Sequence, residues 1–224
     1  ANVLNNSITY HNLEVVEIGY GINLRPLATF AEKVYGNDAC EFFKPHILDK
    51  NKYDPVDEEL AAKMHKAIAV IQFKVEGQII KRHPEYNMED RLHLTRINFE
   101  KGTVTIKGKE YPLTDKKLPT VDPKDPLKLT KEEEELIHNL CMSFKHSVNL
   151  QRHIRFVYSH GAMYKCCNSN LLYHGCIPMK ENGDFDEIKF NGIIYSGKRM
   201  LDYIEDAVKM AYFLPDDEVG GQAV

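Results

Sequence analysis

Residues 170–178 contain the stretch that decides the expected fold, Asn170-Leu171-Leu172-Tyr173-His174-Gly175-Cys176-Ile177-Pro178. In this stretch an apolar predicted strand ends in His174, and Gly175 is the next residue. Ligands in layered α/β folds bind where strands end. Gly175 would let a backbone or an ion approach closely, and a neutral imidazole is a good ligand for transition metals. The pattern therefore makes His174 a candidate metal ligand at a strand end of an α/β fold.

Two other chemistries can be weighed for the same region. A zinc site could use the residues Cys166, Cys167, His174 and Cys176. Adjacent residues of a strand point to opposite faces, so Cys166 and Cys167 do not easily share one ion. A cysteine phosphatase would need a thiolate cradled by backbone amides and a nearby arginine, but Asn182 is the sixth residue after Cys176 and no Gly-rich loop lies here. Both alternatives are therefore disfavoured.

Apolar periodicity predicts helices and strands on either side of this stretch. We expect helices over 24–35, 55–82, 131–144, 148–159 and 198–213. We expect strands over 162–167, 171–176 and 185–195, a β meander within 92–113 whose first strand is 92–99, and a mobile Pro-rich loop over 115–126. Asp54 and Pro55 suit the start of the long helix, and Thr130 with Glu133 forms a capping-box pattern. The fold class is thus α/β, or α+β for a fragment.

Composition excludes several classes of protein. The chain has 224 residues, of which 43% are hydrophobic and 28% charged, so disorder over its whole length is excluded. A net charge of −4 argues against nucleic-acid and anionic-membrane partners. No apolar run approaches the roughly 20 residues of a membrane helix. Five cysteines at irregular spacing indicate reduced thiols and a cytoplasmic location.

Two basic clusters could bind a phosphorylated ligand. The first comprises Lys81, Arg82, His83, Arg91, His93 and Arg96, and the second comprises Arg152, His153, Arg155, His160 and Lys165. An arginine fork donates two hydrogen bonds to a phosphate at once. The alternative is that each cluster is only a solvated surface, because charged residues are mostly exposed.

Several motifs together resemble the class III fructose-1,6-bisphosphatases of bacteria. They lie at 19–27 (GYGINLRPL), 64–68 (MHKAI), 77–82 (GQIIKR), 88–92 (MEDRL) and 170–178. The resemblance covers nearly the whole chain. It also places the chain among the calcineurin-like metallophosphatases, in which a strand ending in His-Gly carries a metal ligand. His174 matches that histidine.

The chain departs from the family pattern at its other metal motifs. Asp-x-His, Gly-Asp-x-x-Asp-Arg-Gly, Gly-Asn-His-Asp and the late Gly-His motif do not occur. We therefore expect that this chain is an internal segment of a longer enzyme. The segment would hold one candidate ligand, His174, of a dinuclear Mn²⁺ site. The isolated segment is expected neither to bind Mn²⁺ tightly nor to hydrolyse a sugar phosphate.

The resemblance implies a layout and an activity for the intact enzyme. Residues 1–35 and 145–224 would belong to the phosphatase core, a calcineurin-like sandwich, and 36–144 would be an inserted, mainly helical lid. The enzyme would hydrolyse the 1-phosphate of fructose 1,6-bisphosphate to give fructose 6-phosphate in gluconeogenesis. From charge alone, Lys81, Arg82, Arg91 and Arg155 are candidates for binding the sugar bisphosphate.

A different class of function stays open. The long helix and the acidic, Pro-rich loop also suit a non-catalytic regulatory or interaction module of a larger cytoplasmic protein. A His174→Ala change in the full-length enzyme and the sequence flanking this chain would separate the two hypotheses. The sequence leaves open the native metal and whether the protein forms a homo-oligomer.

Overall fold

The computed structural model describes residues 1–47, 57–173 and 175–214, and the chain divides into two compact units between Gln151 and Arg152. The first unit contains α1 (Asn2–Thr9), α2 (Arg25–Tyr35), α3 (Glu58–Arg82) and α4 (Lys131–His146). It also contains the π-helix η1 (Val15–Gly19) and the 3₁₀ helices η2 (Glu41–Phe43), η3 (Pro84–Tyr86), η4 (Glu89–Arg91) and η5 (Leu94–Arg96). α5 (Val148–His160) crosses the boundary between the units.

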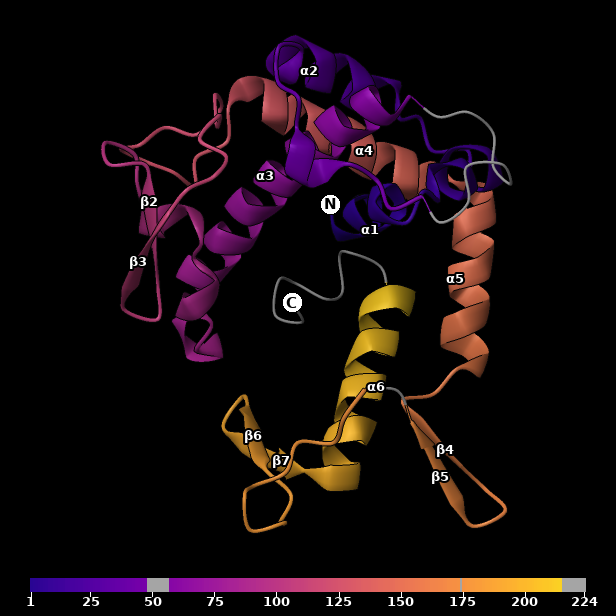
Figure 1. Ribbon diagram of the computed structural model, residues 1–224. Coiled ribbons are helices and arrows are strands. Elements are labelled where there is room, and N and C mark those ends of the chain that lie inside the picture. The colour runs from indigo at the N-terminus through magenta and orange to yellow at the C-terminus, as the bar shows by residue number, and fades with distance from the viewer. Residues whose placement is uncertain (48–56, 174, 215–224) are drawn as a thin grey trace. The chain divides into compact units, whose positions relative to one another are not determined.

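The main core of the first unit forms around the first half of α3 (Figure 1). Helices α1 and α2 contact α3, and α2 also contacts α4. Fully buried residues of this core include Leu4, Ile8, Leu27, Ala31, Ile68 and Ile71. α3 is enclosed on several sides, which is why polar as well as apolar residues of this helix are buried.

The long helix begins later than the sequence pattern indicates. Asp57 is its N-cap, and the carboxylate of Asp57 accepts a hydrogen bond from the amide of Leu60 at 2.9 Å. The predicted start at 55 is therefore wrong, and the predicted cap, Asp54, lies outside the described residues. The predicted end is confirmed, because α3 stops at Arg82, two residues before Pro84.

A second apolar cluster lies on the far half of α3 and is made by Val70, Leu94, Val121 and Leu127. Beside it stands an antiparallel sheet of β1 (Ile97–Asn98), β2 (Thr103–Ile106) and β3 (Lys109–Pro112), in that order. Val104 lies opposite Ile97 on one side and Tyr111 on the other. The predicted meander is confirmed for β2 and β3.

The predicted strand 92–99 is mostly wrong, because residues 94–96 form the 3₁₀ helix η5 and only two residues pair with β2. The alternation of apolar residues changes phase inside this stretch. Leu92 and Leu94 occupy even positions, whereas Ile97 and Phe99 occupy odd ones. A single strand would send these pairs to opposite faces, and the intervening turn lets all four pack against one cluster.

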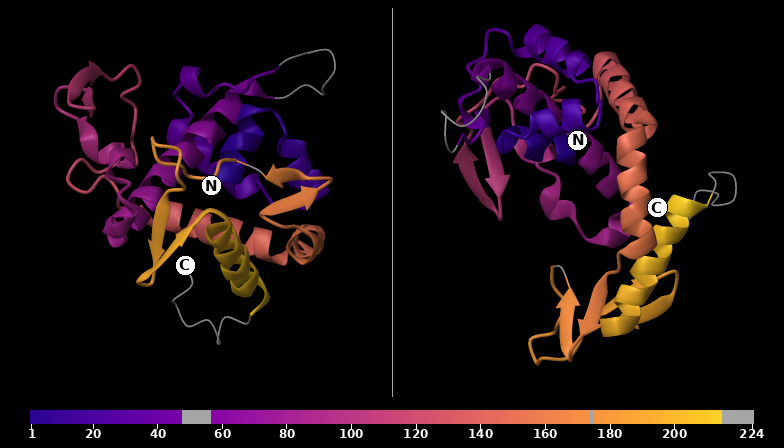
Figure 2. Two further views of the ribbon diagram at one scale, coloured as in Figure 1. Left: turned by 90° about the horizontal axis from the view of Figure 1, so that it is seen from below. Right: turned by 90° about the vertical axis from the view of Figure 1, so that its right-hand side faces the viewer.

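The second unit consists of two hairpins and a helix. β4 (Tyr164–Cys167) pairs with β5 (Asn170–Tyr173), β6 (Glu187–Phe190) pairs with β7 (Ile193–Ser196), and α6 (Gly197–Phe213) follows. Figure 2 shows each hairpin as a separate two-stranded ribbon. The predicted helices over 24–35, 131–144, 148–159 and 198–213 are confirmed as α2, α4, α5 and α6.

Two strand predictions in this unit need correction. Residues 185–195 form a hairpin rather than one strand, because Asn191 and Gly192 adopt φ of 47° and 83° and make the two-residue turn that such dipeptides favour. The strand predicted over 171–176 ends at Tyr173. Gly175, with φ of 87°, takes a left-handed conformation that an extended strand cannot contain.

Mixed helices and small antiparallel sheets confirm the α/β class at this coarse level. Among the described helices, none is long and apolar enough to cross a bilayer.

Candidate functional site

The candidate metal ligand His174 lies outside the described residues. The strand before it is β5, as expected, and Asn168 and Ser169 form the hairpin turn with φ of 50° and 62°. The glycine after it has a φ that favours glycine, and a Cβ there would meet nothing within 4 Å. The backbone next to position 174 is therefore open on the glycine side.

The described residues bring together no group of three His, Cys, Asp or Glu side chains that could hold a metal ion. Cys166 and Cys167 occupy successive positions of β4, and both are exposed free thiols. In the hairpin, Cys166 lies opposite Leu171 and Cys167 lies opposite Asn170. The described part of this chain does not by itself fit a dinuclear divalent-metal centre.

Three of the candidate phosphate-binding residues lie on the last turn of α3 or on a short helix that contacts α3. Lys81 and Arg82 form its last turn, and Arg91 ends η4, which contacts α3. All three side chains are exposed. Cations in the last turn of a helix also interact favourably with the helix dipole. Lys81 and Arg82 therefore stabilise α3 whether or not they bind an anion.

Carboxylates and a backbone carbonyl contact several basic side chains near this end of α3. Arg91 lies 3.9 Å from the carboxylate of Glu76, and Arg96 donates to the backbone carbonyl of Glu89 at 2.8 Å. The Nδ1 atom of His83 lies 2.9 Å from Oε1 of Glu85, and this hydrogen bond lowers the pKa of the Glu85 carboxyl. In this part of the described chain, the exposed ammonium of Lys81 and guanidinium of Arg82 have no ion pair within 4.0 Å.

Arg155 belongs to the second unit. Its guanidinium lies 5.9 Å from the ring centroid of Phe213 in α6, within the range of a cation–π interaction. Tyr158 and Tyr212 pack nearby along the same two helices, with ring centroids 4.6 Å apart. Arg155 thus has a packing role between α5 and α6, and the sequence cluster that contains it is divided from the first cluster by the unit boundary.

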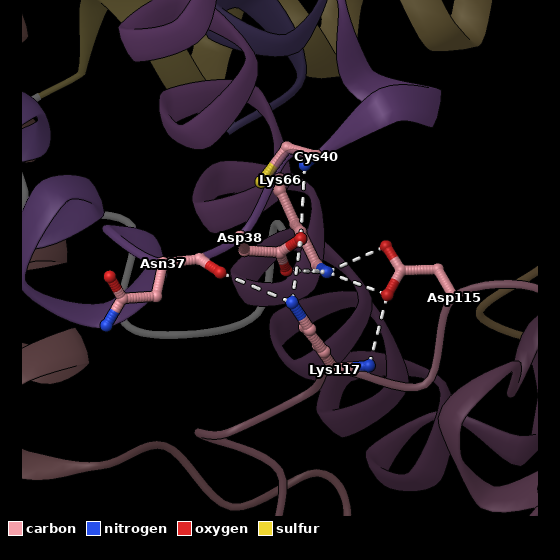
Figure 3. A network of polar contacts seen from close by, with 6 residues as sticks. All are labelled: Asn37, Asp38, Cys40, Lys66, Asp115 and Lys117. Atoms are coloured by element: carbon pink, nitrogen blue, oxygen red, sulfur yellow. Dashed lines mark hydrogen bonds and ion pairs between the residues drawn. The ribbon is translucent and has the colours of Figure 1, made fainter.

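A buried polar network, which the sequence pattern did not reveal, lies at the middle of α3. The ammonium of Lys66 is fully buried and contacts Asp38 at 2.6 Å and Asp115 at 2.7 Å (Figure 3). Lys117 lies 4.0 Å from Asp38 and donates to the carbonyl of Asn37. Two cations therefore face two carboxylates, and the network links the end of α2 to the start of the Pro-rich loop.

Asp38 of this network and the nearby Cys40 both have shifted pKa values. Burial alone would raise the pKa of Asp38, but the hydrogen bonds from Lys66 and from the amide of Cys40, with the charges of Lys66 and Lys117, outweigh it and lower that pKa. Burial raises the pKa of the Cys40 thiol to about 11. Cys40 is therefore a protonated, unreactive thiol at neutral pH.

A second buried lysine lies two turns further along α3. The ammonium of Lys74 contacts the Glu133 carboxylate at 2.7 Å and donates to the carbonyl of Thr120 at 2.6 Å. Glu133 also closes the predicted capping box with Thr130, and both hydrogen bonds of the box are present. The Pro-rich loop is irregular, as predicted, and its Asp115 carboxylate and Thr120 carbonyl contact the two buried lysines of α3.

A signal for these lysines does exist in the sequence. Lys66, Val70 and Lys74 form a stripe at four-residue spacing, and Val70 belongs to the second apolar cluster. A lysine in a stripe that includes a core residue must be buried or must extend to the surface. Only the positions of Asp115 and Glu133 decide between these outcomes, and both are distant in sequence.

Comparison with known proteins gives one consistent family. The model for the Firmicute fructose-1,6-bisphosphatase family matches residues 1–222. Among curated relatives, the class 3 fructose-1,6-bisphosphatase of Clostridium tetani is 56% identical over 218 residues, and that of Clostridium novyi is 55% identical over 212. The corresponding protein of Listeria innocua is 49% identical over 212 residues.

These alignments cover 97%, 95% and 95% of this chain but only 33%, 32% and 32% of the three relatives. The chain thus spans about a third of the length of the curated relatives it matches. No solved structure matches it significantly. A match over nearly every residue, with about half of the positions identical, leaves one assignment: the chain belongs to the Firmicute fructose-1,6-bisphosphatase family.

Proposed function

We propose that this chain is part of a class 3 fructose-1,6-bisphosphatase, a phosphoric monoester hydrolase that releases the 1-phosphate of fructose 1,6-bisphosphate in gluconeogenesis in the cytoplasm. The observation that carries the proposal is the family match over residues 1–222. The curated relatives named as class 3 fructose-1,6-bisphosphatases add identities of 49–56%. The substrate would be a sugar bisphosphate and the product fructose 6-phosphate.

We further propose that His174 is one metal ligand and that the other ligands come from parts of the enzyme outside these 224 residues. Support comes from the match of the strand-His-Gly pattern to the family motif and from the open backbone at Gly175. A dinuclear centre with Mn²⁺ needs more donors than the described residues bring together. When bound, such a pair of ions would supply a hydroxide and polarise the phosphoryl group.

The direct test uses the full-length polypeptide that carries this sequence. Release of inorganic phosphate from fructose 1,6-bisphosphate is measured for the full-length protein and for the 224-residue chain. We expect turnover by the former and none by the latter. Failure of the full-length protein to hydrolyse the substrate with Mn²⁺ supplied would overturn the activity. It would also favour a non-catalytic regulatory module.

The ligand assignment has its own test. His174→Ala in the full-length protein is expected to lower both activity and bound manganese, measured by elemental mass spectrometry after desalting. His138→Ala is the matched control, since His138 is an exposed histidine on α4. Unchanged activity and metal content in His174→Ala would remove His174 from the site.

The layout of the intact enzyme is part of the same proposal. Residues 1–35 and 145–224 would belong to a calcineurin-like core and 36–144 to a lid. The two hairpins of the second unit support a place within a larger sheet, because Leu171, Leu172 and Tyr173 are each about half exposed. A two-stranded sheet alone is only marginally stable, and apolar residues on both of its faces are typical of a strand covered on both sides.

We also propose that Lys81, Arg82 and Arg91, and separately Arg155, bind the substrate through a phosphate. The exposed positive charge at the end of α3 supports the first three. Substitution of Lys81 or Arg82 by glutamine in the full-length enzyme is expected to raise KM about tenfold, the effect of losing one charge-assisted hydrogen bond, with little change in kcat. Lys109→Gln, an exposed lysine in β3, is the control. An unchanged KM in these variants and in Arg91→Gln and Arg155→Gln would show that both clusters are only solvated surface.

A further inference from the structure

A pocket of about 660 Å³ opens in the first unit where α1, η1, α2 and the start of α3 meet. Its volume lies within the range of about 300–1,000 Å³ that small-molecule sites occupy. Apolar side chains form most of its wall, among them Ile8, Leu13, Leu24, Leu60 and Met64. Leu24, Arg25 and Met64 of this wall belong to the family motifs at 19–27 and 64–68, but no candidate metal-binding or phosphate-binding residue lies on it. The pocket is therefore distinct from the candidate metal-binding and phosphate-binding residues.

Two costly backbone features line the same pocket. His11 adopts φ of 58°, a left-handed conformation that non-glycine residues rarely take. Val15 and Ile18 belong to the π-helix η1, a rare type of helix that is frequent at functional sites. Backbone strain of this kind persists only where the surrounding structure holds it, and it concentrates at binding sites. Two such features on one wall favour a ligand site over a packing defect.

The charges of the lining residues indicate which ligands fit. Glu14, Glu17 and Asp57 contribute three carboxylates, and Arg25 contributes one guanidinium, so the described lining carries two more negative than positive charges. The side chains of Glu14 and Glu17 are exposed at the rim. The Asp57 carboxylate caps α3, where it accepts a hydrogen bond from the amide of Leu60. A cation at the rim would thus be attracted while an apolar body fills the wall.

We propose that this pocket binds a small amphipathic cation, a molecule with an aromatic or branched apolar body and a protonated amine. The body would lie against Leu24, Leu60 and Met64, where burial of apolar surface provides the affinity. The amine would lie at the rim beside Glu14 and Glu17, where the negative charge would favour cationic ligands over neutral and anionic ones. Ile18, whose side chain is 75% exposed, would be covered on binding.

The first test compares three probes that share one indole body. Tryptamine carries an ammonium, tryptophol a neutral hydroxyl and indole-3-acetate a carboxylate. Calorimetric titration of the 224-residue chain is expected to show that tryptamine binds at least tenfold more tightly than indole-3-acetate. Tryptophol is expected to bind with an affinity between those two. Equal binding of all three, the reverse order, or no binding of tryptamine at millimolar concentration would overturn the proposal.

The second test places the probe. Glu17→Gln removes one rim charge from an exposed side chain and is expected to weaken tryptamine binding about fivefold while leaving tryptophol unchanged. Ala28→Trp, in the α2 wall, would fill the pocket and abolish binding of both. Glu134→Gln, an exposed glutamate on α4, is the control with the same charge change. Weaker tryptamine binding in the Glu134→Gln control, or unchanged tryptamine binding in Glu17→Gln, would contradict the assignment.

The remaining test concerns a different occupant. A second copy of the chain could cover Val15 and Ile18 instead of a ligand. Light scattering during size-exclusion chromatography would then show a dimer that Ile18→Asp dissociates, and this result would overturn the small-molecule proposal. We expect a monomer of about 26 kDa that Ile18→Asp leaves unchanged.

Discussion

At the scale of single residues, two fully buried lysines on α3 stand out. An isolated buried ammonium costs several kcal/mol, so its charge must be met by partners. Lys66 has Asp38 and Asp115, whereas Lys74 has Glu133 and one backbone carbonyl. Each lysine ties a segment distant in sequence to the same helix. They therefore contribute specificity to the position of the loop as much as stability.

Removing the charge of Lys74 should destabilise the first unit strongly. Lys74→Met keeps the length of the side chain but leaves the Glu133 carboxylate buried without a cation. We expect the free energy of unfolding to fall by about 3–5 kcal/mol, the usual cost of breaking one side of a buried pair. This free energy can be measured by urea denaturation, with circular dichroism as the readout of unfolding.

The control for Lys74→Met is a double variant. Glu133→Gln retains the capping-box oxygen but removes the charge, so Lys74→Met with Glu133→Gln should lose less stability than the sum of the two single variants. Additive losses would mean that the two side chains do not interact.

The lowered pKa of Asp38 predicts how stability depends on pH. Because the carboxyl is more acidic folded than unfolded, its contribution is complete above its ordinary pKa of 3.8 and is lost as pH falls through the lower, folded value. Asp38→Asn should therefore lower the urea midpoint at pH 7, and the difference from wild type should shrink below pH 4. A difference that stays constant from pH 3 to pH 7 would contradict the lowered pKa.

At the scale of elements, the contact between α3 and the Pro-rich loop depends on one glycine. Gly77 is buried in α3, and a Cβ at this position would lie 2.6 Å from Cδ2 and 3.3 Å from Cγ of Leu127. Gln78 next to it donates to the carbonyl of Leu127 at 2.7 Å. The missing side chain thus allows the loop to cross directly over the helix.

Gly77→Ala should destabilise the chain although alanine favours helices. The gain in helix propensity is about 1 kcal/mol, but the whole Leu127 side chain must move within a packed cluster, which costs about 1–3 kcal/mol. Thermal unfolding should show a lower Tm. The loss should be smaller when Gly77→Ala is introduced into Leu127→Ala than into wild type, and a raised Tm for Gly77→Ala alone would refute the close approach.

Elements with strong local signals were predictable from the sequence. The Thr130 capping box, the proline after α3 and the apolar faces of α2 and α6 marked these helices correctly. The failures occurred where two local signals competed. Residues 92–99 alternate but change phase after Leu94, and the Asn191-Gly192 turn lay within an otherwise β-rich run.

The site was less predictable than the elements. Position 174 and the basic residues at the end of α3 could be selected from residue type and sequence context. The two lysine networks could not, because each joins partners between 28 and 59 residues apart. Such pairs depend on tertiary packing, which no local pattern encodes. The predicted roles of His174, Lys81, Arg82, Arg91 and Arg155 remain predictions.

At the scale of the whole molecule, the two units differ in the size of their cores. Among its described residues, the first unit buries eighteen in its main cluster. In the described part of the second unit, the buried side chains of α6 are Met200 and Leu201, while Phe190, Tyr195 and Tyr203 stack at its edge. Less buried apolar surface means less stability.

We therefore expect the second unit to exchange its amide hydrogens first. Hydrogen–deuterium exchange of the 224-residue chain should show fast exchange in 187–213 and slow exchange in 60–80. Leu201→Ala should accelerate exchange only in the second unit, and Leu27→Ala mainly in the first. Equal protection across both regions, or acceleration of both units by either variant, would mean that the chain unfolds as one cooperative body.

The burial of Lys66 and Lys74 also determines where a protease can act on the native chain. Trypsin cleaves after lysine and arginine, and the sites for it on α3 are Lys63, Lys66, Lys74, Lys81 and Arg82. The first three are buried in the folded state, whereas the last two are exposed at the end of the helix. Limited digestion would thus leave the segment from Glu58 to Ile80 in one piece, and a cut after Lys66 would report that α3 had separated from its carboxylate partners.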